Sequence, residues 1–394
     1  MKKRVLPYGL HEIDEEDIQS VIDVLRSGNI TQGQKVVDFG KELAAYTGAK
    51  YAVPVANGTC ALHASVAALD VNPGDEIITT PMSFCATANA GLYQGANIKF
   101  VDIDENTLNI DPKKIEEKIT ENTKVIMPVD FRGHPANLEE INLIAKKNQL
   151  HVIEDGSHSI GSKYKIDGKS YSCGDGIHAD LCTFSFHPVK HITTGEGGAI
   201  LTNNYDLYKK VSALVKHGIS RREEMFSETK RIGPWYYEME ALGFNFRLTD
   251  FQAALGISQL KKIERYKSRR RQIVDYYNQE FMNLEDIITP FEANNVDSNF
   301  HIYTIQVKEN KYFDRYDLFA HLNQNDYRVM VHYIPIHLLE FYKNSFGYKR
   351  GDFPVSESYY DKALSIPLFP TMTDTEVERV VFDIKNYIHN KKTN

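Results

Sequence analysis

Cysteine, tryptophan and long apolar runs are scarce in this chain. Its 394 residues include four cysteines and one tryptophan, and the cysteines form neither a CxxC pair nor a set with histidine at metal-ligand spacing. This usage excludes a small disulfide-built scaffold, predicts no metal centre and is typical of a reduced compartment. No apolar run reaches the roughly 18 residues of a membrane-spanning helix. We therefore predict a cytoplasmic protein that does not cross a membrane.

Positive charge is also in short supply. The 46 lysines and arginines are outnumbered by 53 aspartates and glutamates, which gives a formal net charge of −7. A nucleic-acid partner is disfavoured, because neutralising phosphates needs a basic surface. One dense basic stretch, residues 261–271, is interleaved with apolar residues and predicts a helix whose basic face is exposed to solvent. Residues 1–4 carry the charge of a signal peptide, but no apolar core follows them, so export is not predicted.

Strand-like and helix-like segments alternate over the first two thirds of the chain, which is typical of α/β folds. One helix is predicted between Asp14, a capping residue, and Gly28, a terminator, and another over residues 36–48. Six short runs rich in β-branched and aromatic residues predict strands at 76–80, 98–101, 124–128, 151–154, 181–186 and 199–202. Helical spacing between several of them implies right-handed crossovers and a mainly parallel sheet, with active residues at strand ends.

The pattern changes after about residue 265. A long polar helix is followed by a strand-like run at 300–305 and a terminal amphipathic helix. We predict a large domain over residues 1–265, which includes the N-terminal segment, and a smaller α+β domain over residues 266–394.

The most informative feature is a lysine that follows a strand and precedes a glycine-rich run. Residues 183–199 read TFSFHPVKHITTGEGGA, with the lysine at position 190. A lysine held there and partly desolvated has a lowered pKa, which makes it a candidate Schiff-base former. A surface loop lysine is the alternative, and this window does not separate the two. The glycines lack the GxGxxG spacing of a dinucleotide-binding dehydrogenase, and Pro188 argues against His187 and His191 as a helical pair of metal ligands.

Two further segments match the needs of an enzyme that uses pyridoxal phosphate (PLP). Asp155 ends an apolar strand, where a carboxylate can keep the pyridine nitrogen of PLP protonated; a helix cap or turn is the alternative role. Gly58 and Thr59 begin a predicted helix and are a plausible phosphate cradle, although Gly-Thr is also an ordinary cap. Phe84 could stack on a cofactor ring or belong to the core.

Together these residues resemble the fold-type I, PLP-dependent sugar-nucleotide aminotransferases of the DegT/DnrJ/StrS type. The family marker Ser-Phe-His-x-x-Lys-x-Ile-Thr-Thr-Gly-Glu-Gly-Gly is present in full from Ser185 to Gly198, and the likeness runs from Leu6 to Asp374. The resemblance implies an α/β fold, the PLP-dependent transferase fold of type I, with a mainly parallel sheet flanked by helices and a smaller C-terminal α+β domain. It also implies PLP as the cofactor.

The resemblance implies a role for each matching residue. Lys190 would bind the cofactor covalently, and Asp155 would face its ring nitrogen. The other implied cofactor contacts are Ser185, Gly58 and Thr59 to the phosphate, Phe84 to the ring face, His158 near the 3-oxygen and Asn245 to the phosphate of a neighbouring subunit. The last contact implies a homodimer with active sites shared across the interface.

A finer resemblance is to aminotransferases of the pseudaminic acid pathway, which aminate C4 of a UDP-linked 4-keto-6-deoxy-N-acetylhexosamine. It rests on residues 31–33, 233–239 and 332–337, and it implies a ping-pong reaction with L-glutamate as amino donor. The implied substrate contacts are Tyr8, Thr31, Gln32, His187, Arg247, His332 and Tyr333. The alternatives are another nucleotide-sugar 3- or 4-aminotransferase, a sugar dehydratase, which would carry histidine in place of Lys190, and a non-enzymatic regulator with this fold.

Overall fold

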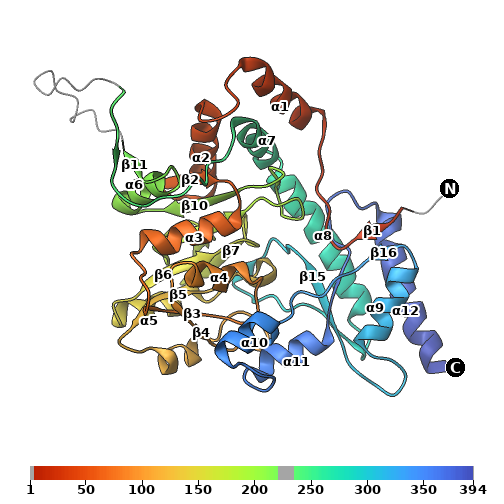
Figure 1. Cartoon of the computed structure of the whole chain (residues 1–394). Coiled ribbons are helices and arrows are strands. Elements are labelled where there is room, and N and C mark those ends of the chain that lie inside the picture. The colour runs from red at the N-terminus through yellow and green to blue at the C-terminus, as the bar shows by residue number, and fades with distance from the viewer. Residues whose placement is uncertain (1–3, 221–234, 394) are drawn as a thin grey trace, which may run out of the picture.

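A seven-stranded sheet forms the centre of the molecule (Figure 1). The computed structural model describes residues 4–220 and 235–393. The strand order is β2 (Tyr51–Val55), β10 (Gly198–Thr202), β9 (Leu181–Ser185), β6 (His151–Asp155), β5 (Thr123–Met127), β3 (Glu76–Thr79) and β4 (Asn97–Phe100). The pairs from β9 to β4 are parallel, and β10 runs antiparallel to both of its neighbours. The predicted α/β class and all six predicted strands are confirmed.

Helices cover both faces of this sheet. Successive side chains of a strand point to opposite faces of the sheet. In β5, Val125 and Met127 pack in one apolar cluster with α3 and α6, whereas Ile126 packs in another with α5. The helices near the sheet are α1 (Glu15–Ser27), α2 (Gln34–Thr47), α3 (Gly58–Ala68), α4 (Ala86–Leu92), α5 (Leu138–Lys147), α6 (Tyr205–Leu214) and α7 (Asp250–Leu260). As predicted, Asp14 caps α1 and Gly28 ends it in a left-handed conformation with φ 83°.

A second core is built on a three-stranded antiparallel sheet of β13 (Ile287–Ile288), β15 (Tyr303–Val307) and β17 (Ala363–Ile366). The helices of this part are α8 (Ile263–Phe281), α9 (Arg315–Gln324), α10 (Glu340–Phe346), α11 (Pro354–Lys362) and α12 (Asp374–Thr393). The strand expected at 300–305 begins at Tyr303, because Phe300 has a left-handed backbone with φ 48°.

Shorter elements complete the fold. The strands β7 (Lys163–Ile166), β8 (Lys169–Ser172) and β14 (Val296–Asp297) form one small sheet, and β11 (Ile219–Ser220) and β12 (Glu238–Met239) form another. Single 3-10 turns lie at Pro112–Lys114, Glu116–Lys118, Phe131–Gly133 and Ile336–Leu338. No helix in residues 4–220 and 235–393 has the length and apolar character needed to span a membrane.

The N-terminal segment lies against the second core. Strand β1 (Leu6–Pro7) pairs in parallel with β16 (Tyr327–Arg328), and Leu6 is fully buried in the second cluster. The sequence predicts this segment in the large domain. In the structure its short strand pairs with an edge of the second core instead. We propose a division near residue 265, at the start of α8, which runs from the sheet toward α9 and α12 (Figure 1).

The prediction of an exposed basic face at residues 261–271 holds for Lys261 and Arg265 only. Lys262 forms ion pairs with Asp14 and Asp17, Lys267 with Asp297, and Arg271 with Glu292, while Arg270 is 1% exposed. Each acidic partner is distant in sequence, so these ion pairs could not be predicted from the local charge pattern.

Arg270 is expected to be a major contributor to stability. Its Nη1 donates to the carbonyl oxygens of His301 at 3.1 Å and Leu368 at 2.9 Å, and more weakly to that of Phe300 at 3.4 Å. Arg270→Met leaves these buried oxygens without a donor, so we expect unfolding to become easier by about 2–4 kcal/mol in urea titrations. The nearby Arg265→Met, which removes an exposed ion pair with Glu12, is the control, with an expected cost below about 1 kcal/mol. Equal shifts in the two variants would contradict this role.

Candidate active site

A cavity of about 840 Å³ lies at the carboxyl ends of the sheet strands. Parallel α/β sheets bind ligands at this edge, because the loops there converge. Eleven of the predicted site residues line the cavity: Tyr8, Gly58, Thr59, Phe84, Asp155, His158, Ser185, His187, Lys190, His332 and Tyr333. Their positions in the sequence range from Tyr8 to Tyr333, so the fold brings residues from distant parts of the chain to one cavity.

Four predicted residues do not line this cavity. Asn245, Thr31 and Gln32 are exposed, and Arg247 is half-buried. Three of them sit in isolated backbone bridges, Thr31 with Thr249, Arg247 with Val55 and Asn245 with Lys216. Their roles stay predictions. Of the segment at 233–239, residues 233 and 234 lie outside the described part of the chain.

Lys190 is half-buried in the turn after β9, where its backbone N–H donates to the His187 carbonyl oxygen at 2.8 Å. Burial lowers the pKa of Lys190 to about 8, and the charge of Asp155 opposes this shift. Roughly a tenth of the amine is therefore unprotonated at neutral pH, far more than for an ordinary lysine. An uncharged amine beside a cavity is a nucleophile and a base.

Asp155 is the last residue of β6 and is 2% exposed. Its Oδ2 accepts a hydrogen bond from the Thr87 hydroxyl at 2.6 Å, and its Oδ1 accepts from the Ser157 N–H at 3.1 Å. The Ser83 hydroxyl lies 2.7 Å from that of Thr87. Because the Thr87 proton points at Asp155, Ser83 is the donor in the second bond. The carboxylate is thus fixed in the cavity wall and oriented by two neighbours.

His158 is buried, and its two ring nitrogens have different partners. Nδ1 accepts from the Arg132 backbone N–H at 3.3 Å, and Nε2 lies 3.1 Å from the Tyr333 hydroxyl. Burial and the nearby charge of Lys190 hold the pKa of His158 well below its ordinary value. The ring is therefore neutral, with its proton on Nε2, and it presents a donor to the cavity.

The start of α3 has the donors that a phosphate group requires. Asn57 caps this helix by accepting from the Cys60 N–H at 2.8 Å, and the N–H groups of Gly58 and Thr59 have no partner among the described residues. A Cβ atom on Gly58 would lie 2.9 Å from the Ser185 Cβ, so only glycine lets Ser185 approach. Helix N-termini attract anions, and the cavity therefore fits a phosphorylated ring compound held by Lys190 and Asp155.

Sequence reasoning missed the residues that support this site. Thr87, which holds Asp155, lies in α4 and has no motif of its own. His63 and Tyr93 also line the cavity, with the His63 ring 5.1 Å from that of Tyr93. Their position becomes visible only when α3 and α4 pack on the sheet.

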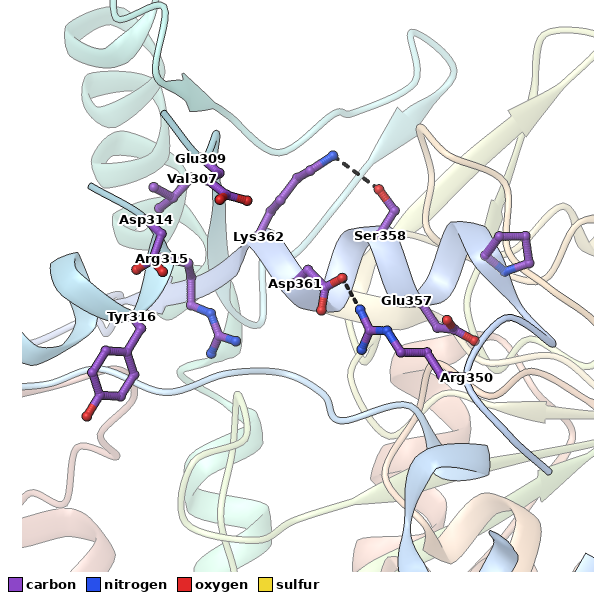
Figure 2. A pocket seen from close by; sticks show the side chains of 11 residues that line it. Val307, Glu309, Asp314, Arg315, Tyr316, Arg350, Glu357, Ser358, Asp361 and Lys362 are labelled. Atoms are coloured by element: carbon purple, nitrogen blue, oxygen red, sulfur yellow. Dashed lines mark hydrogen bonds and ion pairs between the residues drawn. The ribbon is translucent and has the colours of Figure 1, made fainter. Parts of the chain in front are cut away.

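A second cavity, of about 390 Å³, lies between α9 and α11 (Figure 2). None of the predicted site residues lines it. Opposite charges pair within it, since Arg350 contacts Asp361, and the Lys362 ammonium donates to the Ser358 hydroxyl at 3.1 Å. The described residues that line this second cavity provide no set of reactive groups comparable to the lysine, aspartate and free N–H groups of the first cavity.

Glu154, next to Asp155, faces the opposite side of the sheet and lies close to Asp130. Both carboxyl groups are buried; burial and the charge of Asp130 raise the pKa of Glu154 well above its ordinary value. Ligand atoms of Asp130, Glu154 and Cys173 lie within 4.8 Å of one another, but burial also raises the pKa of the Cys173 thiol. Metal binding needs deprotonated ligands, so the raised pKa values of Glu154 and Cys173 disfavour a metal ion at this cluster.

The raised pKa of Glu154 predicts a dependence of stability on pH. The folded state holds the Glu154 proton more tightly than the unfolded state, so stability is greatest below the ordinary pKa of 4.5 and falls as pH rises toward the folded value. Glu154→Gln keeps a donor toward Asp130 and cannot ionise. We expect its melting temperature to fall less than that of the wild type between about pH 5 and pH 9. Glu121→Gln, at an exposed position, is the control, and parallel curves for all three proteins would contradict a raised pKa of Glu154 in the folded state.

The fold and the site define a PLP-dependent aminotransferase, and comparison with known proteins agrees. Residues 11–385 match the DegT/DnrJ/EryC1/StrS aminotransferase family. The chain belongs to this family, and its cofactor is pyridoxal phosphate.

Individual relatives are similar over nearly the whole chain. The spore coat polysaccharide biosynthesis protein SpsC of Bacillus subtilis is 38% identical over 390 residues, which cover 98% of both chains. The UDP-4-amino-4,6-dideoxy-N-acetyl-beta-L-altrosamine transaminase of Campylobacter jejuni is 38% identical over 371 residues, 93% of both chains. Spr1654 of Streptococcus pneumoniae, described as a sugar aminotransferase, has been solved in a PMP form that is 29% identical, with a TM-score of 0.90 and coverage of 98% and 100%. The chain is therefore a sugar aminotransferase.

Proposed function

We propose that this enzyme moves the amino group of L-glutamate to C4 of a UDP-linked 4-keto-6-deoxy-N-acetylhexosamine, in the synthesis of a pseudaminic-acid type sugar. The observation that carries the proposal is the convergence of Lys190, Asp155 and the free N–H groups of α3 on one cavity. The likeness to the Campylobacter transaminase supports the choice of sugar. All four cysteines are unpaired, which supports a cytoplasmic setting.

Each residue of the site has a defined task in this proposal. Gly58, Thr59 and Ser185 would bind the cofactor phosphate, and Asp155 would face its ring nitrogen. Bound PLP supplies an electron sink that stabilises negative charge on the carbon next to the transferred nitrogen. Lys190 would hold the cofactor in the resting enzyme and, as a free amine, would move a proton between the Cα of the amino acid and C4′ of the cofactor.

Other residues would bind the cofactor ring and the sugar substrate. Phe84 is 60% exposed in the cavity wall and would stack on the cofactor ring, while His158 would donate to its 3-oxygen. Tyr8, His187, His332 and Tyr333 line the same cavity and would contact the nucleotide sugar.

Asn245, Thr31, Gln32 and Arg247 would act across a homodimer interface. They lie outside the cavity of their own chain, and a second subunit would bring them to a neighbouring active site. This arrangement would supply the guanidinium of Arg247 and the Asn245 amide to a neighbouring cavity.

The test separates the two half-reactions. We expect the purified protein with PLP to show a visible absorption band that bleaches when L-glutamate is added. We then expect the glutamate-treated enzyme to aminate the C4-keto UDP-sugar in a panel that also contains C3-keto and other nucleotide sugars. Amination of a different member would favour another nucleotide-sugar aminotransferase. A band indifferent to glutamate would leave the dehydratase and the regulator as explanations.

A further inference from the structure

Three buried histidines lie together behind the wall of the active-site cavity. The rings of His158 and His301 are 4.4 Å apart between centroids, and those of His301 and His191 are 6.0 Å apart. All three are at most 5% exposed. They come from the loop after β6, from the residue after Lys190 and from the segment before β15, so tertiary packing alone assembles them.

Several polar atoms in this cluster have no partner among the residues that the structure describes. They are both ring nitrogens of His191, Nδ1 of His301 and Oδ1 of Asn299. The amide nitrogen of Asn299 donates to the His158 carbonyl oxygen at 2.9 Å, which places this residue beside the histidines. Leaving a buried polar group unpaired is unfavourable, and buried groups of this kind are normally satisfied by enclosed water.

The charged groups that act on the cluster are cations. Lys190 acts on all three rings, Arg270 acts on His191 and His301, and Lys267 acts on His191. Burial, reinforced by these charges, holds the pKa of each histidine well below its ordinary value. Each ring is therefore neutral at physiological pH and has one donor and one acceptor nitrogen, which suits a chain of hydrogen bonds through water.

We propose that His301 and His191 are positioning residues which, with enclosed water, form a neutral hydrogen-bonded layer beneath Lys190 and hold the His158 ring with its Nε2–H toward the cavity. The hydrogen bonds at the two edges of the His158 ring are not short, at 3.3 Å from the Arg132 N–H to Nδ1 and 3.1 Å between Nε2 and the Tyr333 hydroxyl, and His301 packs against the ring. The inference rests on the proposed role of His158 as a cofactor ligand.

The first test examines the cofactor-free protein with labelled histidine. Long-range nitrogen–proton NMR is expected to show wild-type His158 with its proton on Nε2. In His301→Phe, which keeps a buried ring but removes both nitrogens, we expect both His158 tautomers to be populated. We also expect the dissociation constant for PLP to rise by about tenfold, equivalent to about 1.4 kcal/mol. His389→Phe, at an exposed position of α12, is expected to change neither measurement.

A conservative variant separates the loss of the ring nitrogens from a general effect on folding. His301→Gln retains a donor and an acceptor for water and is expected to recover most of the PLP affinity and the single His158 tautomer. If His301→Phe does not fold, the same comparison between His191→Phe and His191→Gln takes its place.

A crystal structure provides the second test, with ordered water expected within hydrogen-bond distance of the His191 and His301 nitrogens. A dry cluster, or a folded His301→Phe with unchanged tautomer and PLP affinity within twofold of wild type, would overturn the proposal. These measurements use neither amino donor nor sugar, so their failure is distinguishable from a failure of the proposed reaction.

Discussion

Lys190→Ala is expected to reduce amino transfer by at least about 10³-fold, because it removes both the covalent attachment and the base. The residue is suited to both tasks, since burial lowers its pKa to about 8 and its side chain lines the cavity. The protein should still bind PLP through the groups at the start of α3, but more weakly. The visible absorption band of the lysine-bound cofactor should be lost, and adding L-glutamate should cause no bleaching.

The control for this substitution is Lys343→Ala, which removes an exposed lysine of α10. Its turnover and spectrum should match those of the wild type. Activity of Lys190→Ala within about tenfold of wild type, far short of the loss expected for a missing base, would refute the role of Lys190.

Asp155→Asn is expected to lower kcat/KM by about 10²–10³-fold, the usual effect of removing one electrostatic group from a buried site. The substitution keeps the shape of the side chain and its place beside Thr87 but removes the negative charge. The pKa of Lys190 should also fall, because Asp155 raises it. The acidic limb of the pH–rate profile should therefore move to lower pH, which a purely structural role would not cause.

The adjacent Glu154→Gln is a matched control for Asp155→Asn. Both residues are buried acids of β6, but alternation along the strand directs Glu154 to the opposite face, toward Gly174. Its kcat/KM should stay within about twofold of wild type, inside the range expected for a substitution that leaves the transition state untouched. Similar losses in both variants would mean that disturbance of the strand, and not the Asp155 charge, limits activity.

Much of the central sheet could be predicted because its strands are short, buried and dense in β-branched residues. The exception is β2, which contains Pro54 and so lacks the sequence pattern of a strand. In the structure β2 is the edge strand, and proline is tolerated there because one side of the strand needs no pairing. The strand expected from residue 300 starts three residues later, since the conformation of Phe300 is imposed by its surroundings and not by its own preference.

The sequence by itself determined the class of this enzyme, because the motif around Lys190 and the acid at Asp155 are local patterns that match those of a known family. The sequence also determined the mainly parallel α/β sheet, because strands that are buried on both faces require continuous apolar runs. Only the tertiary structure decided that Thr87 orients Asp155, that acids distant in sequence neutralise the basic helix α8, and that three histidines meet beneath Lys190. The physical reason is that hydrogen bonds and ion pairs act over a few ångströms in space, and residues widely separated along the chain come that close only after the chain has packed.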